Sequence, residues 1–177
     1  MVATVEAPQS AEHRLIEYLR QSGKLDAEGA ARAWRVFEHT RVSLTKILLE
    51  LGLVPERELI GAFGSGLDIP LADPSEYPLE LVLPEATTER FMKEAKAVVL
   101  AATDESVTVA TVDPLDRYTC DAIALASDRR VVLKAATSSD IEEAHRRLYA
   151  GSDADALTAA TADSAQDATD ADVARLR

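Results

Sequence analysis

Cysteine is nearly absent from this chain of 177 residues, since Cys120 is the only one. A lone cysteine excludes an internal disulfide and any metal site built from several thiolates. The chain also lacks an uninterrupted apolar run of the roughly 18 to 20 residues needed to cross a bilayer, and no basic segment precedes an apolar one at its N-terminus. We therefore expect a cytoplasmic protein with no direct membrane insertion.

Basic residues are too few for a nucleic-acid-binding protein. The chain has 19 Lys and Arg against 31 Asp and Glu, which gives a formal net charge of −12. Binding to a phosphate backbone requires a concentrated basic surface that displaces counterions, so we predict no nucleic-acid partner. The acidic excess favours solubility or a basic protein partner.

Known catalytic and metal-binding patterns are missing as well. The phosphate-loop pattern Gly-x-x-x-x-Gly-Lys-Ser/Thr does not occur. The only glycine cluster, within residues 61–66, has the wrong spacing and is predicted to end a helix rather than to follow a strand. Three histidines (His13, His39 and His145) are scattered over three predicted helices and have no cysteine pair nearby. We predict no catalytic residue and no metal site in this chain.

What the chain does have is a duplicated helical pattern. The first copy aligns with the second at an offset of 29 residues, as Arg14-Leu15-x-x-x-Leu19-x-x-x-Gly23 over Ser43-Leu44-x-x-x-Leu48-x-x-x-Gly52. Leucines four residues apart form one helical face, and each glycine suits a left-handed helix end. Asp26 as N-cap and Pro55 in the first turn then begin two further helices, which end near His39 and near residues 62–63.

One helix pair cannot bury its own apolar stripe, so the two pairs should share a core. We predict a helical domain over residues 9–66, with a core of Leu15, Leu19, Trp34, Leu44, Leu48, Leu59 and Phe63. Trp34 alternatively suits a partner-binding hot spot. Its alignment with Phe63 in the repeat favours the core.

The second half predicts a small α/β module. Four prolines within residues 70–84 indicate an extended connector over residues 67–82. We predict that the module covers residues 83–150 and starts with a helix opened by Pro84, followed by strands at 97–102 and 106–112. A second helix begins at Asp113-Pro114 with Tyr118 facing inward. A strand at 130–136 and a last helix with the capping box Ser139-x-x-Glu142 complete the module. A strand, crossover helix and strand favour parallel pairing. The predicted fold class is α+β, a helical bundle followed by a module with a three-stranded sheet.

Both ends of the chain have compositions that cannot bury much apolar surface. We expect a disordered N-terminus over residues 1–8 and a flexible linker, rich in alanine and aspartate, over residues 151–177.

Several segments, taken in order, resemble the N-terminal region of the ATPases that power type II secretion and type IV pilus assembly (the GspE type). They are the duplicated pattern above, Asp68-Ile69-Pro70-Leu71, Leu83-Pro84-Glu85, Val107-Thr108-Val109-Ala110, Asp113-Pro114 and Ser138-Ser139-Asp140-Ile141. The resemblance covers nearly the whole chain.

This resemblance implies a docking role. In the family, the helical domain binds the cytoplasmic domain of an inner-membrane assembly protein (GspL-like) and so recruits the motor to the membrane periphery. A downstream ATPase domain of the longer protein carries ATP and Mg²⁺, so this chain is expected to be no enzyme and to hold no cofactor itself. A free-standing adaptor unrelated to any ATPase is an alternative.

Cyclic di-GMP sensing is another alternative, because a subset of the family binds this dinucleotide through the same duplicated motif. The corresponding positions retained here are Arg14, Leu15, Leu19, Gly23, Leu44, Leu48 and Gly52. Other positions depart from the motif: Ile16 and Thr45 replace glycines, Ser43 replaces arginine, and Phe37 and Gly66 replace glutamines. Losing charge-assisted contacts of about 1.5–3 kcal/mol each argues against binding.

Two charged groups of residues have both a functional and an ordinary interpretation. Five arginines of the first helix pair suit an acidic partner or simply a solvated face; they are Arg14, Arg20, Arg32, Arg35 and Arg41. Asp113, Asp116 and Asp121 suggest an acidic site, but Asp113 is sufficiently explained as a helix N-cap.

Overall fold

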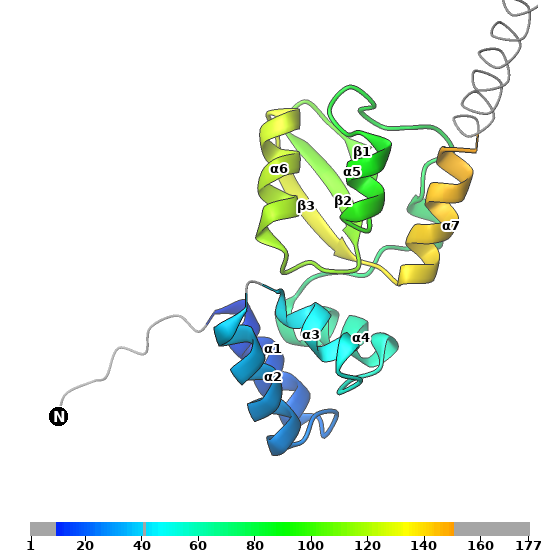
Figure 1. The fold of residues 1–177 in the computed structure, drawn as a ribbon. Helices are drawn as coiled ribbons and strands as arrows, with labels where there is room; N and C mark the ends of the chain where they lie inside the picture. The colour runs from blue at the N-terminus through cyan, green and yellow to red at the C-terminus, as the bar shows by residue number, and fades with distance from the viewer. Residues whose placement is uncertain (1–9, 41, 151–177) are drawn as a thin grey trace, which may run out of the picture.

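A computed structural model describes residues 10–40 and 42–150 of the chain. Within these ranges the helices of the first part gather beneath a sheet-bearing module, as Figure 1 shows in blue-to-cyan and green-to-orange. The predicted fold class is confirmed: a helical bundle precedes a module with a three-stranded sheet. The predicted disordered N-terminus and the predicted linker over 151–177 lie outside the described residues.

The helical bundle consists of α1 (Ala11–Gln21), α2 (Ala27–His39), α3 (Leu44–Glu50) and α4 (Glu56–Leu67). The first three helices begin at a polar side chain that accepts a hydrogen bond from a first-turn N–H, which satisfies an otherwise unpaired donor. These caps are Ser10, Asp26 and Ser43. Helix α1 packs mainly on α4, and α2 packs mainly on α3.

Gly23 and Gly52 end the first helix of each pair, as predicted. Their φ angles are +71° and +63°, in the left-handed region that other residues adopt only with strain. A Cβ added at either position would meet no atom within 4 Å. Backbone conformation, rather than crowding, therefore selects glycine at both helix ends.

The bundle core contains six of the seven predicted residues in fully buried positions: Leu15, Leu19, Leu44, Leu48, Leu59 and Phe63. The seventh, Trp34, packs against this core but is only partly buried. Its repeat partner Phe63 lies on α4, which packs against α1 in the interior. Trp34 instead lies against His13 at the outer side of α1, with the two ring centroids 4.1 Å apart.

The module is built on strands β1 (Ala97–Ala102), β2 (Ser106–Thr111) and β3 (Arg130–Ala135), in that order across the sheet. β1 and β2 form an antiparallel hairpin, and a shift in register follows Val99. β2 and β3 run parallel because α6 (Arg117–Ser127) crosses between them. The predicted parallel pairing is confirmed.

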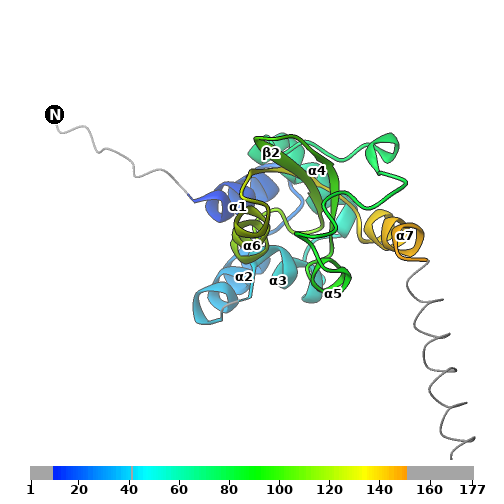
Figure 2. The same cartoon turned by 90° about the horizontal axis from the view of Figure 1, so that it is seen from above.

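Two apolar clusters hold helices against the sheet. Met92 of α5 (Glu89–Glu94) and Ile123 of α6 pack with one set of strand side chains, including Val107. Ile141 of α7 (Ser138–Leu148) packs with the other set, including Val98. Figure 2 shows α5 and α6 on the same side of the sheet, whereas α7 lies apart from these two helices.

Several predicted helix boundaries are wrong. α4 continues to Leu67 instead of ending at residues 62–63, and Pro55 precedes its first turn. The turn after Leu83 does not continue as a helix, because Thr88 provides the N-cap that starts α5. α4 ends where Asp68 adopts a left-handed conformation and its N–H donates to the Phe63 carbonyl, and α5 starts where the Thr88 side chain accepts from the N–H of Phe91.

The starts of α6 and α7 also differ from prediction. Asp116, not Asp113, caps α6, so that Tyr118 points outward with 77% of its surface exposed. Thr137 caps α7 by accepting from the N–H of Asp140, and the predicted Ser139-x-x-Glu142 capping box does not form.

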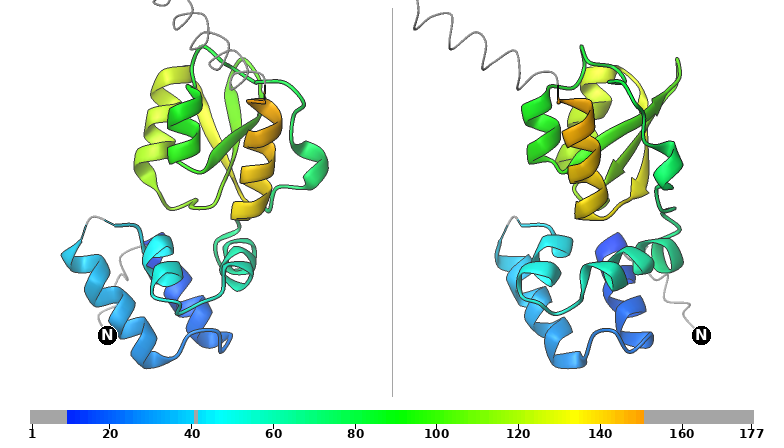
Figure 3. Two further views of the ribbon diagram at one scale, coloured as in Figure 1. Left: turned by 45° about the vertical axis from the view of Figure 1, so that its right-hand side comes forward. Right: turned by 90° about the vertical axis from the view of Figure 1, so that its right-hand side faces the viewer.

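The connector contributes to the sheet module. Leu71 forms an isolated parallel bridge with Ala135 at the end of β3, and a short 3-10 helix, Pro74–Glu76, follows. The two further views in Figure 3 show this segment running up beside the strands. Ala135 belongs to the apolar cluster of the bundle, so the two parts share buried contacts. The predicted domain boundaries stay predictions.

None of the helices within residues 10–40 and 42–150 has both the length and the apolar character of a bilayer-spanning segment.

Candidate functional site

An open groove of about 740 Å³ runs between α1 and α2 on the outside of the bundle. The two helices approach through small residues of α2, which leave room between them. The lining residues are His13, Ile16, Glu17, Arg20 and Gln21 of α1, and Ala27, Ala30, Ala31 and Trp34 of α2. The groove therefore has an apolar floor and a polar rim, as protein-binding sites do.

Trp34 closes one end of this groove. Its ring lies 4.1 Å from that of His13 and 5.3 Å from that of Phe37, which fixes its orientation. The indole Nε1 donates to Glu38 Oε1 at 2.9 Å, so the donor is satisfied without a partner protein. The remaining indole surface offers a rigid, partly exposed apolar contact.

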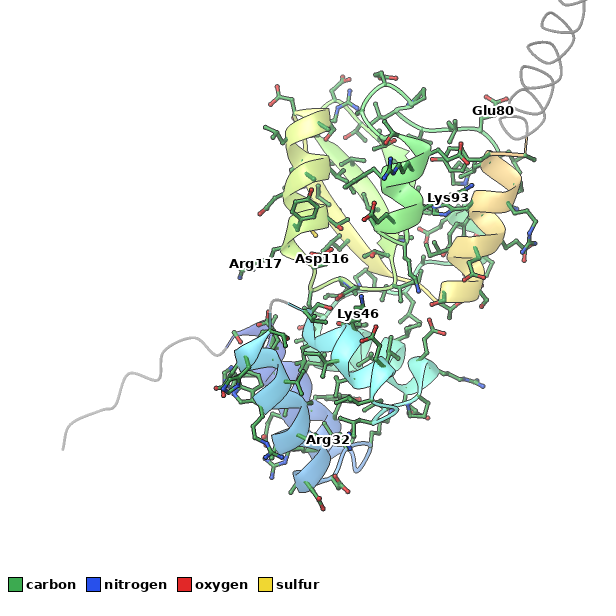
Figure 4. All side chains as sticks on the ribbon, viewed as in Figure 1. Arg32, Lys46, Glu80, Lys93, Asp116 and Arg117 are labelled. Atoms are coloured by element: carbon green, nitrogen blue, oxygen red, sulfur yellow. The ribbon has the colours of Figure 1, made fainter. Side chains whose placement is uncertain are left out.

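Arginines follow the outer surface of the same helices. Arg14, Arg20, Arg32 and Arg35 are exposed, while Arg41 lies outside the described residues. Arg20 forms an ion pair with Glu17 of the same helix, with the charged atoms 3.5 Å apart. Figure 4 shows Arg32 at the end of the bundle away from the sheet module. Four glutamates on the same two helices (Glu12, Glu17, Glu28 and Glu38) balance these four arginines, so α1 and α2 together carry no net charge.

The predicted motif residues do not form one surface. The four leucines Leu15, Leu19, Leu44 and Leu48 meet in the bundle core and are at most 1% exposed. Arg14 is exposed on α1, and both glycines lie in helix-ending turns. The structure therefore assigns packing and turn geometry to most of these positions.

Contacts within the chain occupy the motif positions of the second copy. Ser43 caps α3 and donates its hydroxyl hydrogen bond to Asp113 Oδ2 of the α/β module. Thr45 is buried, and its Oγ1 has no hydrogen-bond partner among the described residues. Gly66 lies so close to Tyr18 that an added Cβ would be 2.7 Å from its Cγ. Sequence reasoning missed these contacts because their partners are distant in the chain.

Asp113 is a largely buried carboxylate at the junction of the two parts. Burial raises its pKa above the usual aspartate range, against the opposing effect of hydrogen bonds from the Ser43 hydroxyl and the N–H of Leu115. The charge of nearby Asp116 raises the pKa further. The cleft beside Asp113 also contains four other charged groups: Lys46, Glu50, Glu94 and Lys96.

The raised pKa of Asp113 predicts a pH effect on stability. A folded state with the higher pKa binds the proton more tightly, so the resulting stabilisation is complete below the ordinary aspartate value of about 3.9 and is lost as pH rises through the folded value. Asp113→Asn removes this dependence. We expect the melting temperature of the variant, relative to the natural chain, to increase from about pH 4 to about pH 7.

The control for this measurement is Asp104→Asn, at an exposed aspartate in the hairpin turn. The two variants are compared with the natural chain by thermal unfolding at each pH. Equal pH slopes for Asp113→Asn and Asp104→Asn would contradict the expectation.

The other candidate residues have packing roles where their surroundings are described. His145 is buried, and its Nε2 lies 2.8 Å from the carbonyl oxygen of Ala97. Cys120 is partly buried in α6, and burial, with help from Asp116, raises the pKa of its thiol to about 11. Over residues 10–40 and 42–150, no three His, Cys, Asp or Glu side chains cluster so as to hold a metal ion.

Known structures share this fold. The N-terminal domain of XpsE matches in one crystal form with a TM-score of 0.66 and 26% identity, and in a second form with 0.55 and 28%; each match covers 81% of this chain and 99% of the other. The structure of MshE with cdg matches with a TM-score of 0.59 and 20% identity, over 76% of this chain and 98% of the other. This last likeness shows the fold alone.

The matches define a class, the α+β N-terminal region of type II secretion proteins of the E type. The MshEN domain model matches residues 67–155, and the chain therefore belongs to the MshEN domain family. Type II secretion system protein E of Xanthomonas campestris pv. campestris is 30% identical over 175 residues, which cover 96% of this chain. The chain spans 30% of the length of that relative.

Proposed function

We propose that this chain is the docking and regulatory region of a type II secretion ATPase, and that its α1–α2 groove receives the cytoplasmic domain of an inner-membrane assembly protein of the GspL type. The observation that carries the proposal is the open groove ending at the partly exposed Trp34. The similarity to type II secretion system protein E over 96% of the chain supports the proposal that the chain acts in a type II secretion system.

The groove has the features of a protein-binding hot spot. Tryptophan and arginine contribute most to binding when a partner covers them and excludes water. Trp34 offers such a ring, and Arg20 lies on the rim of the same groove. Arginines and glutamates share the surface of α1 and α2, so we expect a partner surface of mixed charge around an apolar anchor.

The proposal assigns no chemistry to this chain. It lies in the cytoplasm, reaches the inner membrane through its partner and catalyses no reaction. ATP and Mg²⁺ belong to an ATPase domain of the longer protein, which the chain connects to the membrane. The lack of a phosphate loop in the sequence supports this division.

The test is binding to the purified cytoplasmic domain of the assembly protein from the same secretion system. Gel filtration should show a joint peak, and calorimetry should give a dissociation constant. We expect Trp34→Ala to weaken binding at least roughly 30-fold, as for a hot-spot residue worth about 2 kcal/mol or more.

Tyr118→Ala is the matched control, because Tyr118 is an exposed aromatic residue on α6 of the other module. It should leave binding unchanged. Equal losses for both variants, or no complex with the natural chain, would reject the groove as the docking site. Melting temperatures of both variants separate lost binding from lost folding.

The cyclic di-GMP alternative is tested with the same calorimeter. Of two motif positions in the second copy, Ser43 already hydrogen-bonds Asp113 and Thr45 is buried. We expect no heat of binding at high micromolar cyclic di-GMP. A saturable signal that Arg14→Ala abolishes would favour the sensing function instead.

A further inference from the structure

Two carboxylates join the helical bundle to the α/β module, one contributed by each part. Asp113 follows β2, and its Oδ2 accepts the hydroxyl hydrogen bond of Ser43 at the start of α3. Hydrogen bonds to carboxylates are stronger than those between neutral groups.

Glu56 makes the reciprocal contact from the bundle. It is the first residue of α4, and its Oε1 accepts from the N–H of Ser138 at 2.8 Å and from the Ser138 hydroxyl at 2.6 Å. Ser138 is the first residue of α7, where backbone donors have no partner within the helix. Each part thus places a carboxylate at a helix start of the other.

The connector provides a third attachment close to these two. The N–H of Ala72 donates to the Ala135 carbonyl at 2.9 Å, and the N–H of Ala135 donates to the Pro70 carbonyl at 2.8 Å. Because the connector leaves α4 directly, these bonds lie where the bundle would pivot relative to the sheet.

The rest of the junction is partly open. A cleft of about 620 Å³ separates α3 from the end of α5 and the loop after β2. Figure 4 shows Lys46 of α3 and Asp116 of the module on facing sides of this region. The open cleft supplies little apolar packing on this side, so apolar contact between the two parts is concentrated around Ala135 and the carboxylate bonds hold the rest of the junction.

We infer that Asp113 and Glu56 form a two-point latch that fixes the bundle in one orientation on the α/β module, and that its release lets the bundle pivot about residues 67–72. The latch controls where the α1–α2 groove lies relative to the module. It acts through contacts within this chain and does not depend on the identity of any docking partner.

The test uses residual dipolar couplings of the ¹⁵N-labelled chain. In the natural chain, one alignment tensor should fit the amides of α1–α4 and of the sheet together. In Asp113→Ala/Glu56→Ala each part should require its own tensor. A single tensor that still fits the double variant, or two tensors in the natural chain, would overturn the latch.

Amide hydrogen exchange gives a second measurement at the pivot. The N–H groups of Ala72 and Ala135 should exchange roughly tenfold faster for each carboxylate contact removed. The matched control is Glu58→Ala, which removes another carboxylate from the first turn of α4. Glu58 pairs with Lys24 inside the bundle at 2.5 Å, so this variant should leave the exchange of Ala72 and Ala135 unchanged.

A variant that loses the bundle altogether is recognised by collapsed amide dispersion for residues 11–67. In that case the single variant Glu56→Ala is used to test the latch, because it leaves the bundle core and the Ser43–Asp113 bond in place. Unchanged exchange at Ala72 and Ala135 in this single variant would overturn the latch.

Discussion

Phe63→Ala should lower the free energy of unfolding by about 3–5 kcal/mol, the usual result of truncating a fully buried aromatic side chain. Phe63 is 0% exposed at the centre of the bundle core, where it packs among leucines of both repeat copies. The bundle cannot collapse around the cavity without moving whole helices. Chemical denaturation with the midpoint and slope fitted separately measures the loss.

Trp34→Ala is the informative comparison, because Trp34 occupies the position of Phe63 in the first repeat copy. Its ring is partly exposed, so truncation should cost only about 1 kcal/mol. Similar losses for the two variants would mean that Trp34 is as deeply packed as Phe63. That result would also remove the apolar end of the proposed docking groove.

Gly66→Ala should destabilise the bundle by about 1–3 kcal/mol through overpacking between α1 and α4. The added Cβ would lie 2.7 Å from Cγ and 2.9 Å from Cβ of Tyr18. The Tyr18 Cβ is attached to the backbone of α1 and cannot rotate away. Relief therefore requires the two helices to separate.

Gly61→Ala is the control within the same helix. A Cβ at Gly61 would meet nothing within 4 Å, so the better helix propensity of alanine should raise stability by about 0.5–1 kcal/mol. Thermal unfolding of the two variants should thus give shifts of opposite sign. Equal shifts would contradict the close approach of Gly66 to Tyr18.

Local signals in the sequence were sufficient for most elements. Leucine spacing and the positive-φ glycines Gly23 and Gly52 predict the helix pairs, because both depend on interactions within one turn or one face. The two β-like runs at residues 97–102 and 106–112 likewise predict the hairpin, and side chains from both faces of its strands enter apolar clusters. The helix predicted between the second and third strands then predicts that these two strands pair in parallel.

Helix starts were predicted less well because several residues near each start could act as caps. Asp113 has good capping chemistry, but it hydrogen-bonds Ser43 instead, and Asp116 caps α6. The choice depends on a partner that local sequence does not reveal. The same holds for Glu56 and Ser138, whose contact has no local pattern.

The candidate groove could be predicted only in part. The repeat identifies α1 and α2 and places Trp34 on a helix, but it treats the two copies as equivalent. Their surroundings differ, because Phe63 lies on α4 packed against α1, whereas Trp34 lines the open groove between α1 and α2. Partial exposure of Trp34 is therefore a tertiary property.

The junction bonds also constrain the order in which the molecule is completed. Ser43 and Asp113 are 70 residues apart in the chain, and Glu56 and Ser138 are 82 apart. Bundle contacts between neighbouring helices close much shorter loops and should form earlier during synthesis. A ribosome-bound chain that has emerged only through α4 therefore has a bundle still free to turn, and only emergence of the start of α7 completes both carboxylate contacts.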